Sequence, residues 1–191
     1  MLIGIEGGLG DGKSVLLAKY LYDEHMVNKR KLMCNMTLYK IPYDKVDVLK
    51  LLEDNTDLNN ICVGIDELTV FVDCRMSSSR ANRFFSYLVL QSRKRNVDIY
   101  YTTQSLQMID FRVVNHTPIT VLCEKMYKND NKEVKDYRHY TIIDMRNIRH
   151  PNIKHFILYI KPYYELYNTD EIIDPLWNVK DKKTFFNYEK R

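Results

Sequence analysis

The strongest constraint on the fold comes from the first fourteen residues, Met1–Ser14. Leu2–Glu6 is a short apolar run, the pattern of a buried strand. The residues that follow fit the spacing G-x-x-x-x-G-K-[ST], with Gly7, Gly12, Lys13 and Ser14 at the defined positions. The periodic segment Val15–Glu24 then predicts a helix. A strand, a glycine loop and a helix in this order are the context that a phosphate-binding loop requires.

The residue types of this loop match the chemistry of phosphate binding. Glycines allow a tight turn in which several backbone N–H groups point at one anion, and the start of a helix adds its positive end. Lys13 would reach the β- and γ-phosphates of a nucleotide, and Ser14 would hold Mg²⁺ through its hydroxyl. We therefore expect ATP and Mg²⁺ to bind here, with the phosphates held by Gly7, Gly8, Leu9, Gly10, Asp11, Gly12, Lys13 and Ser14.

Length and composition favour a single cytoplasmic domain. The chain has 191 residues, and we expect one domain over 1–191, with a core over 1–126 and a C-terminal extension over 127–191. No apolar run approaches the length of a membrane span, and the first residues fit a strand better than a signal peptide. The net charge of +4 is too small by itself to indicate nucleic acid. Reduced cysteines are favoured over a zinc site or disulfides, since the four are widely spaced: Cys34, Cys62, Cys74 and Cys123.

Strands and helices alternate along the first half of the chain. After the first strand and helix, strands are expected at Leu32–Met36, Ile61–Ile65 and Val97–Thr103, with helices at Lys45–Glu53 and Arg80–Arg95. Such alternation favours a parallel sheet with right-handed crossovers. Further on, Ile119–Met126 and Tyr137–Met145 predict an antiparallel hairpin around the turn at Lys128–Lys132, and His155–Ile160 predicts one more strand. The expected fold is α/β, a P-loop NTPase (RecA/ASCE-like) with a mainly parallel central sheet flanked by helices and a C-terminal antiparallel hairpin extension.

An acidic pair follows the most hydrophobic strand, Ile61–Ile65. Asp66 would lie at the carboxyl end of a central strand and hold Mg²⁺ together with Ser14. Glu67 could orient and deprotonate an attacking water, which favours hydrolysis over transfer to a small acceptor. The alternative is an acidic N-cap on the following helix.

Two polar residues end other strands. Gln104 should lie at the same sheet edge as the phosphates, where it could sense the γ-phosphate or place the water, although a polar residue at a strand end is common. Asn35 could hydrogen-bond Glu67 and restrain it, or be an ordinary turn residue.

Basic residues cluster once, at Arg93-Lys94-Arg95. A solvated basic helix end is the default interpretation. In an oligomeric motor, however, an arginine must reach into the neighbour's site and offset charge in the transition state. Arg93 and Arg95 are the candidates for this role, and Arg80 and Arg83 are weaker ones. The serine-rich loop Arg75–Arg80 is either a DNA- or interface-facing loop or a flexible connection.

Taken together, these segments resemble the FtsK/HerA superfamily of DNA-pumping ATPases, in its branch of small viral genome-packaging (A32-like) ATPases. The likeness rests on Gly7–Ser14, Ile61–Glu67, Gln91–Arg95 and Tyr101–Gln104, then Ile109–Arg112 and a "Y-D-T-x-E" phrase at Tyr167–Glu171, which has asparagine in its second place. It implies ATP hydrolysis coupled to double-stranded DNA translocation by a homo-oligomeric ring, a pentamer or hexamer, docked on a capsid or portal-vertex protein. It implies a location in the host cytoplasm or on the virion.

By resemblance, Lys13 and Ser14 hold phosphate and metal, Asp66 the metal, Glu67 is the catalytic base and Gln104 the sensor. Arg93 or Arg95 would be the trans-acting finger. Zonula-occludens-toxin-like phage assembly or export ATPases share this core but normally carry a membrane span. A small P-loop kinase should show an arginine-rich lid. A GTPase should show N-K-x-D, which Asn131–Val134 lacks in its fourth place. A nucleotide-binding scaffold would not need Glu67.

Overall fold

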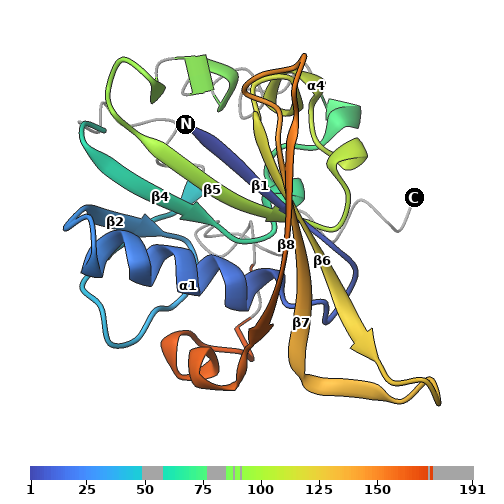
Figure 1. Cartoon of the computed structure of the whole chain (residues 1–191). Coiled ribbons are helices and arrows are strands. Elements are labelled where there is room, and N and C mark those ends of the chain that lie inside the picture. Colours follow the sequence, from blue (N-terminus) through green and yellow to red (C-terminus); the bar gives the residue numbers. More distant parts are fainter. Residues whose placement is uncertain (49–57, 77–84, 88, 91, 172, 174–191) are drawn as a thin grey trace, which may run out of the picture.

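The chain folds around one eight-stranded sheet (Figure 1). This computed structural model describes residues 1–48, 58–76, 85–87, 89–90, 92–171 and 173. The strands are β1 (Leu2–Glu6), β2 (Lys31–Cys34), β3 (Asp44–Lys45), β4 (Ile61–Ile65), β5 (Asp98–Thr103), β6 (Ile119–Tyr127), β7 (Glu133–Asp144) and β8 (Asn152–Tyr159). They lie in the order β3-β2-β4-β5-β1-β6-β7-β8.

The sheet is parallel from β3 to β6 and antiparallel beyond. The sequence predicted parallel pairing for β1, β2, β4 and β5 and the antiparallel hairpin of β6 and β7, but not β3 or the parallel pairing of β6 with β1. β5 lies between β1 and β4, and it pairs in parallel with both. β7 pairs antiparallel with β6, and β8 pairs antiparallel with β7. The predicted hairpin is therefore a three-stranded meander that continues the parallel sheet through β6. β7 also begins earlier than expected, at Glu133.

Helix α1 (Lys13–Met26) covers one face of the sheet. Its buried residues Leu16, Leu17, Ala18 and Leu21 pack against Ile3 and Ile5 of β1 and against residues of β4 to β7. Gly64 of β4 permits this contact, because a Cβ at this position would lie 2.6 Å from a methyl carbon of Leu21. The 3₁₀ helix η4 (Lys161–Leu166) adds buried Leu166 to the same core.

Shorter elements cover the other face. Phe85 and Val89 come from the helical residues 85–87, 89–90 and 92. Leu68 comes from the 3₁₀ helix η1 (Leu68–Val70), and Val113 from α4 (Phe111–Val114). These side chains pack on Leu2, Val63, Ile65, Ile99 and Tyr101 of the sheet. The 3₁₀ helices η2 (Cys74–Met76) and η3 (Leu106–Met108) complete the connections.

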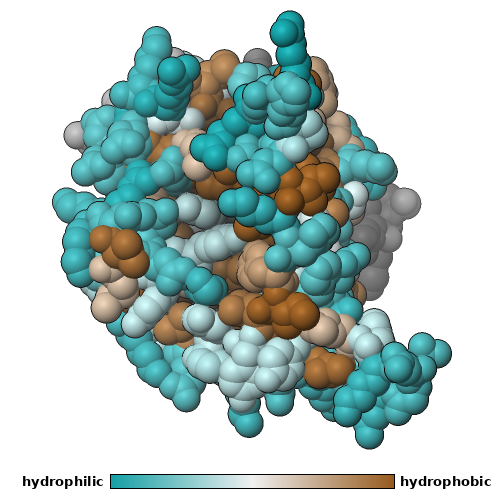
Figure 2. All heavy atoms as spheres, viewed as in Figure 1, coloured by the Kyte–Doolittle hydropathy of each residue, from teal (hydrophilic) through white to brown (hydrophobic). Residues whose placement is uncertain are grey.

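On the α1 face, a groove of about 290 Å³ opens between Tyr20 and Tyr100 and the strands β6 to β8. Apolar Val121 and Ile142 line it, together with polar Asp144 and Lys154. Figure 2 shows several hydrophobic residues near the middle of this view, among mostly hydrophilic ones. Among the described residues, no helix is long and apolar enough to cross a membrane.

Two helix predictions need correction. The helix predicted over Arg80–Arg95 ends by Ser92, since Arg93–Asn96 form a turn. Asn96 has φ +52°, a left-handed conformation that ends helices, and the N–H of Val97 returns to the carbonyl of Ser92 at 2.9 Å. The helix predicted over Lys45–Glu53 begins later: Lys45 belongs to β3, Val48 is helical, and residues 49–53 lie outside the described residues.

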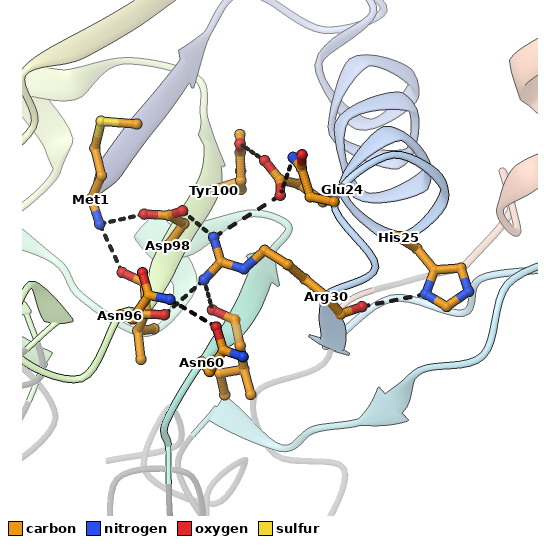
Figure 3. A network of polar contacts seen from close by, with 11 residues as sticks. Met1, Glu24, His25, Arg30, Asn60, Asn96, Asp98 and Tyr100 are labelled. Atoms are coloured by element: carbon orange, nitrogen blue, oxygen red, sulfur yellow. Dashed lines mark hydrogen bonds and ion pairs between the residues drawn. The ribbon is translucent and has the colours of Figure 1, made fainter.

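Arg30 connects several elements at the amino ends of the parallel strands (Figure 3). Its guanidinium pairs with Asp98 of β5 and donates to the carbonyls of Ile61 and Asn96, each at 2.7 Å. The Met1 amine also donates to Asp98, at 2.6 Å. Burial favours a higher pKa for Asp98, but the amine and Arg30 outweigh burial and lower the pKa.

We expect Arg30→Met to lower the free energy of unfolding by about 3 kcal/mol, because a partly buried carboxylate loses one of its two cations. Asp98 has a lowered pKa in the fold, so its contribution is complete above its unfolded pKa of about 4 and is lost as the pH falls through the folded value. The difference in free energy of unfolding between Arg30→Met and the unchanged protein, measured with urea, should therefore become smaller in acid. Lys31→Met, at an exposed neighbour, is the control and should change stability by less than about 0.5 kcal/mol. A loss that is the same at every pH would contradict this explanation.

Candidate nucleotide site

The glycine loop connects the end of β1 to the start of α1, as predicted. Gly10 and Gly12 have φ of +76° and +92°, a region where a side chain is strained. Within the loop, the N–H of Gly8 donates to a carboxylate oxygen of Asp11 at 2.6 Å, and Lys13 Nζ donates to the carbonyl of Gly8 at 2.9 Å. The Lys13 ammonium thus lies across the loop, close to where the phosphates of a bound nucleotide would sit.

Asp66 follows β4 and faces this loop. The Ser14 hydroxyl donates to both carboxylate oxygens of Asp66, at 3.0 and 3.1 Å, although 52 positions separate the two residues. Burial raises the pKa of Asp66, opposed by hydrogen bonds from Thr102 and Ser14 and by the charge of Lys13. A cation bound beside Asp66 would offset the cost of burying its charge.

These residues fit Mg²⁺. Mg²⁺ in proteins usually has one or two carboxylate ligands and completes its octahedron with water and substrate phosphates. The carboxylate of Asp66 and the hydroxyl of Ser14 form an oxygen-only set beside the phosphate loop. The described residues contain no group of three or more His, Cys, Asp or Glu side chains that could hold a metal by themselves. Ser14 and Asp66 supply two oxygen ligands, and an Mg²⁺ ion held there would take the others from water and phosphate.

Glu67 stands beside Asp66 in a left-handed backbone conformation, with φ +52° and ψ +57°. Such a conformation is unusual for a residue with a side chain, and residues like this are often found at functional sites. The side chain is half-buried, and burial followed by the charge of Asp66 raises the pKa of Glu67, while Lys13 lowers it. A carboxylate with a raised pKa is a better proton acceptor than a solvated one.

Thr102 of β5 links the two acids, a role that the sequence interpretation missed. Its buried hydroxyl donates to Asp66 Oδ1 at 2.7 Å and accepts the N–H of Glu67 at 2.8 Å. One hydroxyl therefore fixes the carboxylate of Asp66 and the unusual backbone of Glu67 together. The sequence signal for this role was a hydroxyl residue near the end of β5, the strand that pairs with β4, after which Asp66 and Glu67 follow.

Asn35 also supports Asp66, and the prediction that it hydrogen-bonds Glu67 is wrong. Its side-chain amide accepts the N–H of Asp66 at 2.7 Å and donates to the Asp66 carbonyl at 2.9 Å. This two-way pairing holds the backbone of the residue that ends β4. Asn35 follows β2, the neighbour of β4 in the sheet, so its amide lies beside that backbone.

Gln104 lies at the predicted edge of the sheet. β1 and β5 pair in parallel with Glu6 opposite Thr103, and the N–H of Gly7 donates to the carbonyl of Thr103 at 3.3 Å. Gln104 therefore stands next to the start of the glycine loop, with an exposed side chain. Its role as a sensor stays a prediction.

Arg93 and Arg95 lie at the other end of the sheet. They precede β5, and the N–H of Asn60, just before β4, donates to the carbonyl of Arg95 at 2.9 Å. Since the glycine loop and Asp66 follow the carboxyl ends of the parallel strands, these arginines are remote from the site of their own chain. Arg80 and Arg83 lie outside the described residues, as do positions 77–80 of the predicted loop at Arg75–Arg80.

The C-terminal phrase Tyr167–Glu171 reaches the segment after β2. Leu38 and Tyr167 form an antiparallel bridge. Glu171 accepts hydrogen bonds from the backbone and hydroxyl of Thr37, and it pairs with Lys45 at 2.6 Å. This segment therefore fixes the chain that leads away from Asn35 and the Asp66 backbone.

We expect Thr102→Val to lower the free energy of unfolding by about 2 kcal/mol, because it removes the hydroxyl from a buried carboxylate and from the Glu67 N–H. Thr102→Ser keeps the hydroxyl, so its free energy of unfolding should fall clearly less. Chemical denaturation of both variants beside the unchanged protein measures the difference. Equal losses for valine and serine would show that the methyl group, and not the hydroxyl, matters at this position.

Comparison with known proteins supports the fold assignment. No protein-family model and no curated protein sequence matches the chain. The N-terminal domain of zonular occludens toxin from Neisseria meningitidis matches at a TM-score of 0.59 and 16% identity, over 87% of this chain and 98% of that one. The genome-packaging NTPase B204 of Sulfolobus turreted icosahedral virus 2, in complex with ATPγS, matches at a TM-score of 0.54 and 12% identity, over 80% of this chain and 95% of that one.

A KaiC-like protein from the hyperthermophilic archaeon Pyrococcus horikoshii is a third such structure. It matches at a TM-score of 0.57 and 14% identity, over 82% of this chain and 83% of its own length. Because all three sequence identities are low, the likeness concerns the fold alone. The chain therefore has the mixed α/β fold of the P-loop ATPases.

Proposed function

We propose that the protein is an ATP-hydrolysing DNA translocase of the FtsK/HerA type, acting as a viral genome-packaging motor. The observation that carries the hydrolytic part is the contact of Ser14 with Asp66 beside the glycine loop, with Glu67 next to it. The packaging part is supported by the structural likeness to B204 and by the phrases Gln91–Arg95, Tyr101–Gln104 and Tyr167–Glu171.

The residues of the site have separate roles in this proposal. Lys13 and the loop N–H groups would bind the phosphates, while Ser14 and Asp66 would hold Mg²⁺, which supplies charge neutralisation at the phosphates. Glu67 accepts a proton from the attacking water, and Thr102 keeps its backbone in place. Gln104, exposed at the same edge, contacts the terminal phosphate or the water.

The arginine of the neighbouring subunit completes the site in a homo-oligomeric ring. Arg93 and Arg95 are remote from the glycine loop of their own chain, so only an intermolecular contact could bring them to a site. The ring would translocate double-stranded DNA with sequence-independent, salt-sensitive phosphate contacts, toward a capsid or portal-vertex protein.

A second candidate is an assembly or export ATPase of the zonula-occludens-toxin type. It is favoured by the match to 98% of the N-terminal domain of that toxin. Such a protein would use the same Ser14, Asp66 and Glu67 for hydrolysis, but DNA need not be its substrate.

ATP turnover measured with and without double-stranded DNA separates the two candidates. A DNA motor should show Mg²⁺-dependent ATP hydrolysis that DNA of unrelated sequences stimulates at least about fivefold, with stimulation lost at high salt. Single nucleotides at the same phosphate concentration are the control. Hydrolysis that DNA leaves unchanged would favour the assembly ATPase and would remove the translocase proposal.

The trans role of the arginines is tested with mixed rings. Arg93→Ala or Arg95→Ala should lower turnover by about 10³-fold if that residue is the finger. Mixing that variant with Glu67→Gln subunits should restore part of the activity, because an intact Glu67 then meets an intact arginine across one interface. If neither mixture recovers activity, both arginines are excluded from the role.

A further inference from the structure

Strand β7 contacts the glycine loop directly, across 128 positions of sequence. Arg138 Nε donates to the carbonyl of Gly10 at 3.2 Å, and the Tyr140 hydroxyl donates to the carbonyl of Gly12 at 3.1 Å. Both side chains lie on the face of β7 that α1 covers, and both residues are buried. Side chains of β7 therefore hold the carbonyls of two loop residues, Gly10 and Gly12.

Arg138 is itself fixed by the irregular part of the β6–β7 pairing. The register shifts between Lys125 and Tyr127, and the residues of β7 opposite this shift turn their carbonyls toward the guanidinium. Arg138 Nη1 donates to the carbonyls of Val134, Lys135 and Tyr137 at 3.4, 3.0 and 2.9 Å. Nη2 donates to Glu133 Oε1 at 3.1 Å. The group that reaches Gly10 thus has little freedom to move.

Together with two hydrogen bonds near the loop, Leu16 N–H to the Gly12 carbonyl at 3.2 Å and Asp11 N–H to the Gly8 carbonyl at 3.4 Å, these contacts set where the loop N–H groups point. In a trans peptide the C=O and N–H vectors are opposed. A Gly10 carbonyl held toward Arg138 turns the N–H of Asp11 away from β7, and a Gly12 carbonyl held toward Tyr140 does the same for the N–H of Lys13. The N–H of Lys13 is among the first of α1, which have no acceptor within the helix and are available to an anion.

The loop sequence shows the same dependence on β7. A Cβ on Gly12 would lie 2.8 Å from the Tyr140 oxygen and 2.9 Å from Cγ of Arg138. Glycine is thus required here by these two side chains as well as by its φ of +92°. Burial raises the pKa of Tyr140, so its hydroxyl remains protonated and able to donate.

We propose that Arg138 and Tyr140 are positioning residues, which hold the glycine loop in the conformation that binds nucleotide phosphates. The proposal rests on the proposed function, since it presumes that the loop binds a nucleotide. It assigns to the β6–β7 hairpin a direct part in that binding. Arg138 acts through hydrogen-bond geometry, and its positive charge alone would not suffice.

The test compares Arg138→Lys and Tyr140→Phe with the unchanged protein. Binding of ADP–Mg²⁺ is measured by titration calorimetry, and ATP turnover gives KM and kcat. Lysine keeps the charge but cannot donate to Gly10 and to the β7 carbonyls at once. We expect the Kd and KM to rise about tenfold for Arg138→Lys and severalfold for Tyr140→Phe, with kcat changed less than about threefold.

Two variants serve as matched controls. Tyr137→Phe removes a hydroxyl from an exposed tyrosine of β7, and Arg146→Lys changes an exposed arginine that pairs with Asp144. Both should bind ADP–Mg²⁺ as the unchanged protein does. Thermal unfolding of each variant shows whether it is folded at the temperature of the titration; if Arg138→Lys is not, Tyr140→Phe decides the result.

The outcomes separate the two proposals. If the unchanged protein fails to bind ADP–Mg²⁺, the proposed function itself fails. If it binds and both β7 variants bind equally well, the positioning role is overturned while the proposed function stands. Full affinity in Arg138→Lys with a loss only in Arg138→Gln would mean that charge suffices, which also overturns the proposal.

Discussion

The parallel alignment of β1, β5 and β4 is the constraint on which the site depends. Their carboxyl ends meet at one edge of the sheet, since Glu6 pairs with Thr103 and Ile65 with Tyr101. The glycine loop, Thr102 and Asp66 are far apart in the sequence, and the strand pairing brings them together at this edge. A slip of one residue in either pairing would turn Thr102 or Asp66 to the other face and separate them. The hydrophobic core on both faces of these strands prevents such a slip.

Within this frame, hydrogen bonds from neighbouring strands hold Asp66 and Glu67. Asn35 after β2 holds the backbone of Asp66, and Thr102 of β5 holds its carboxylate and the N–H of Glu67. The loop itself is held from β7. Gly10 and Gly12 adopt left-handed conformations without strain because they lack a side chain. The left-handed conformation of Glu67 is strained and persists because these contacts hold it.

The predictable parts of this molecule are those with a local signal. The glycine loop, the strand Ile61–Ile65 and the acids after it follow from residue spacing and hydrophobic runs, and they form where predicted. The helix end at Ser92 was missed because it depends on the left-handed Asn96, which the apolar periodicity of Phe84, Phe85, Leu88 and Val89 does not reveal. Arg138 and Tyr140 carried no signal either. An alternating strand shows which residues share a face, but not that this face meets a loop 128 positions away.

The central claim is that Glu67, together with the proposed metal ligands Ser14 and Asp66, forms a site of ATP hydrolysis. ATP turnover and ATP binding of Glu67→Gln test it most directly, because the substitution removes the proton acceptor and leaves the phosphate and metal ligands in place. We predict that ATP–Mg²⁺ binds with unchanged affinity while turnover falls by at least about 10²-fold. Turnover at the rate of the unchanged protein would contradict the claim.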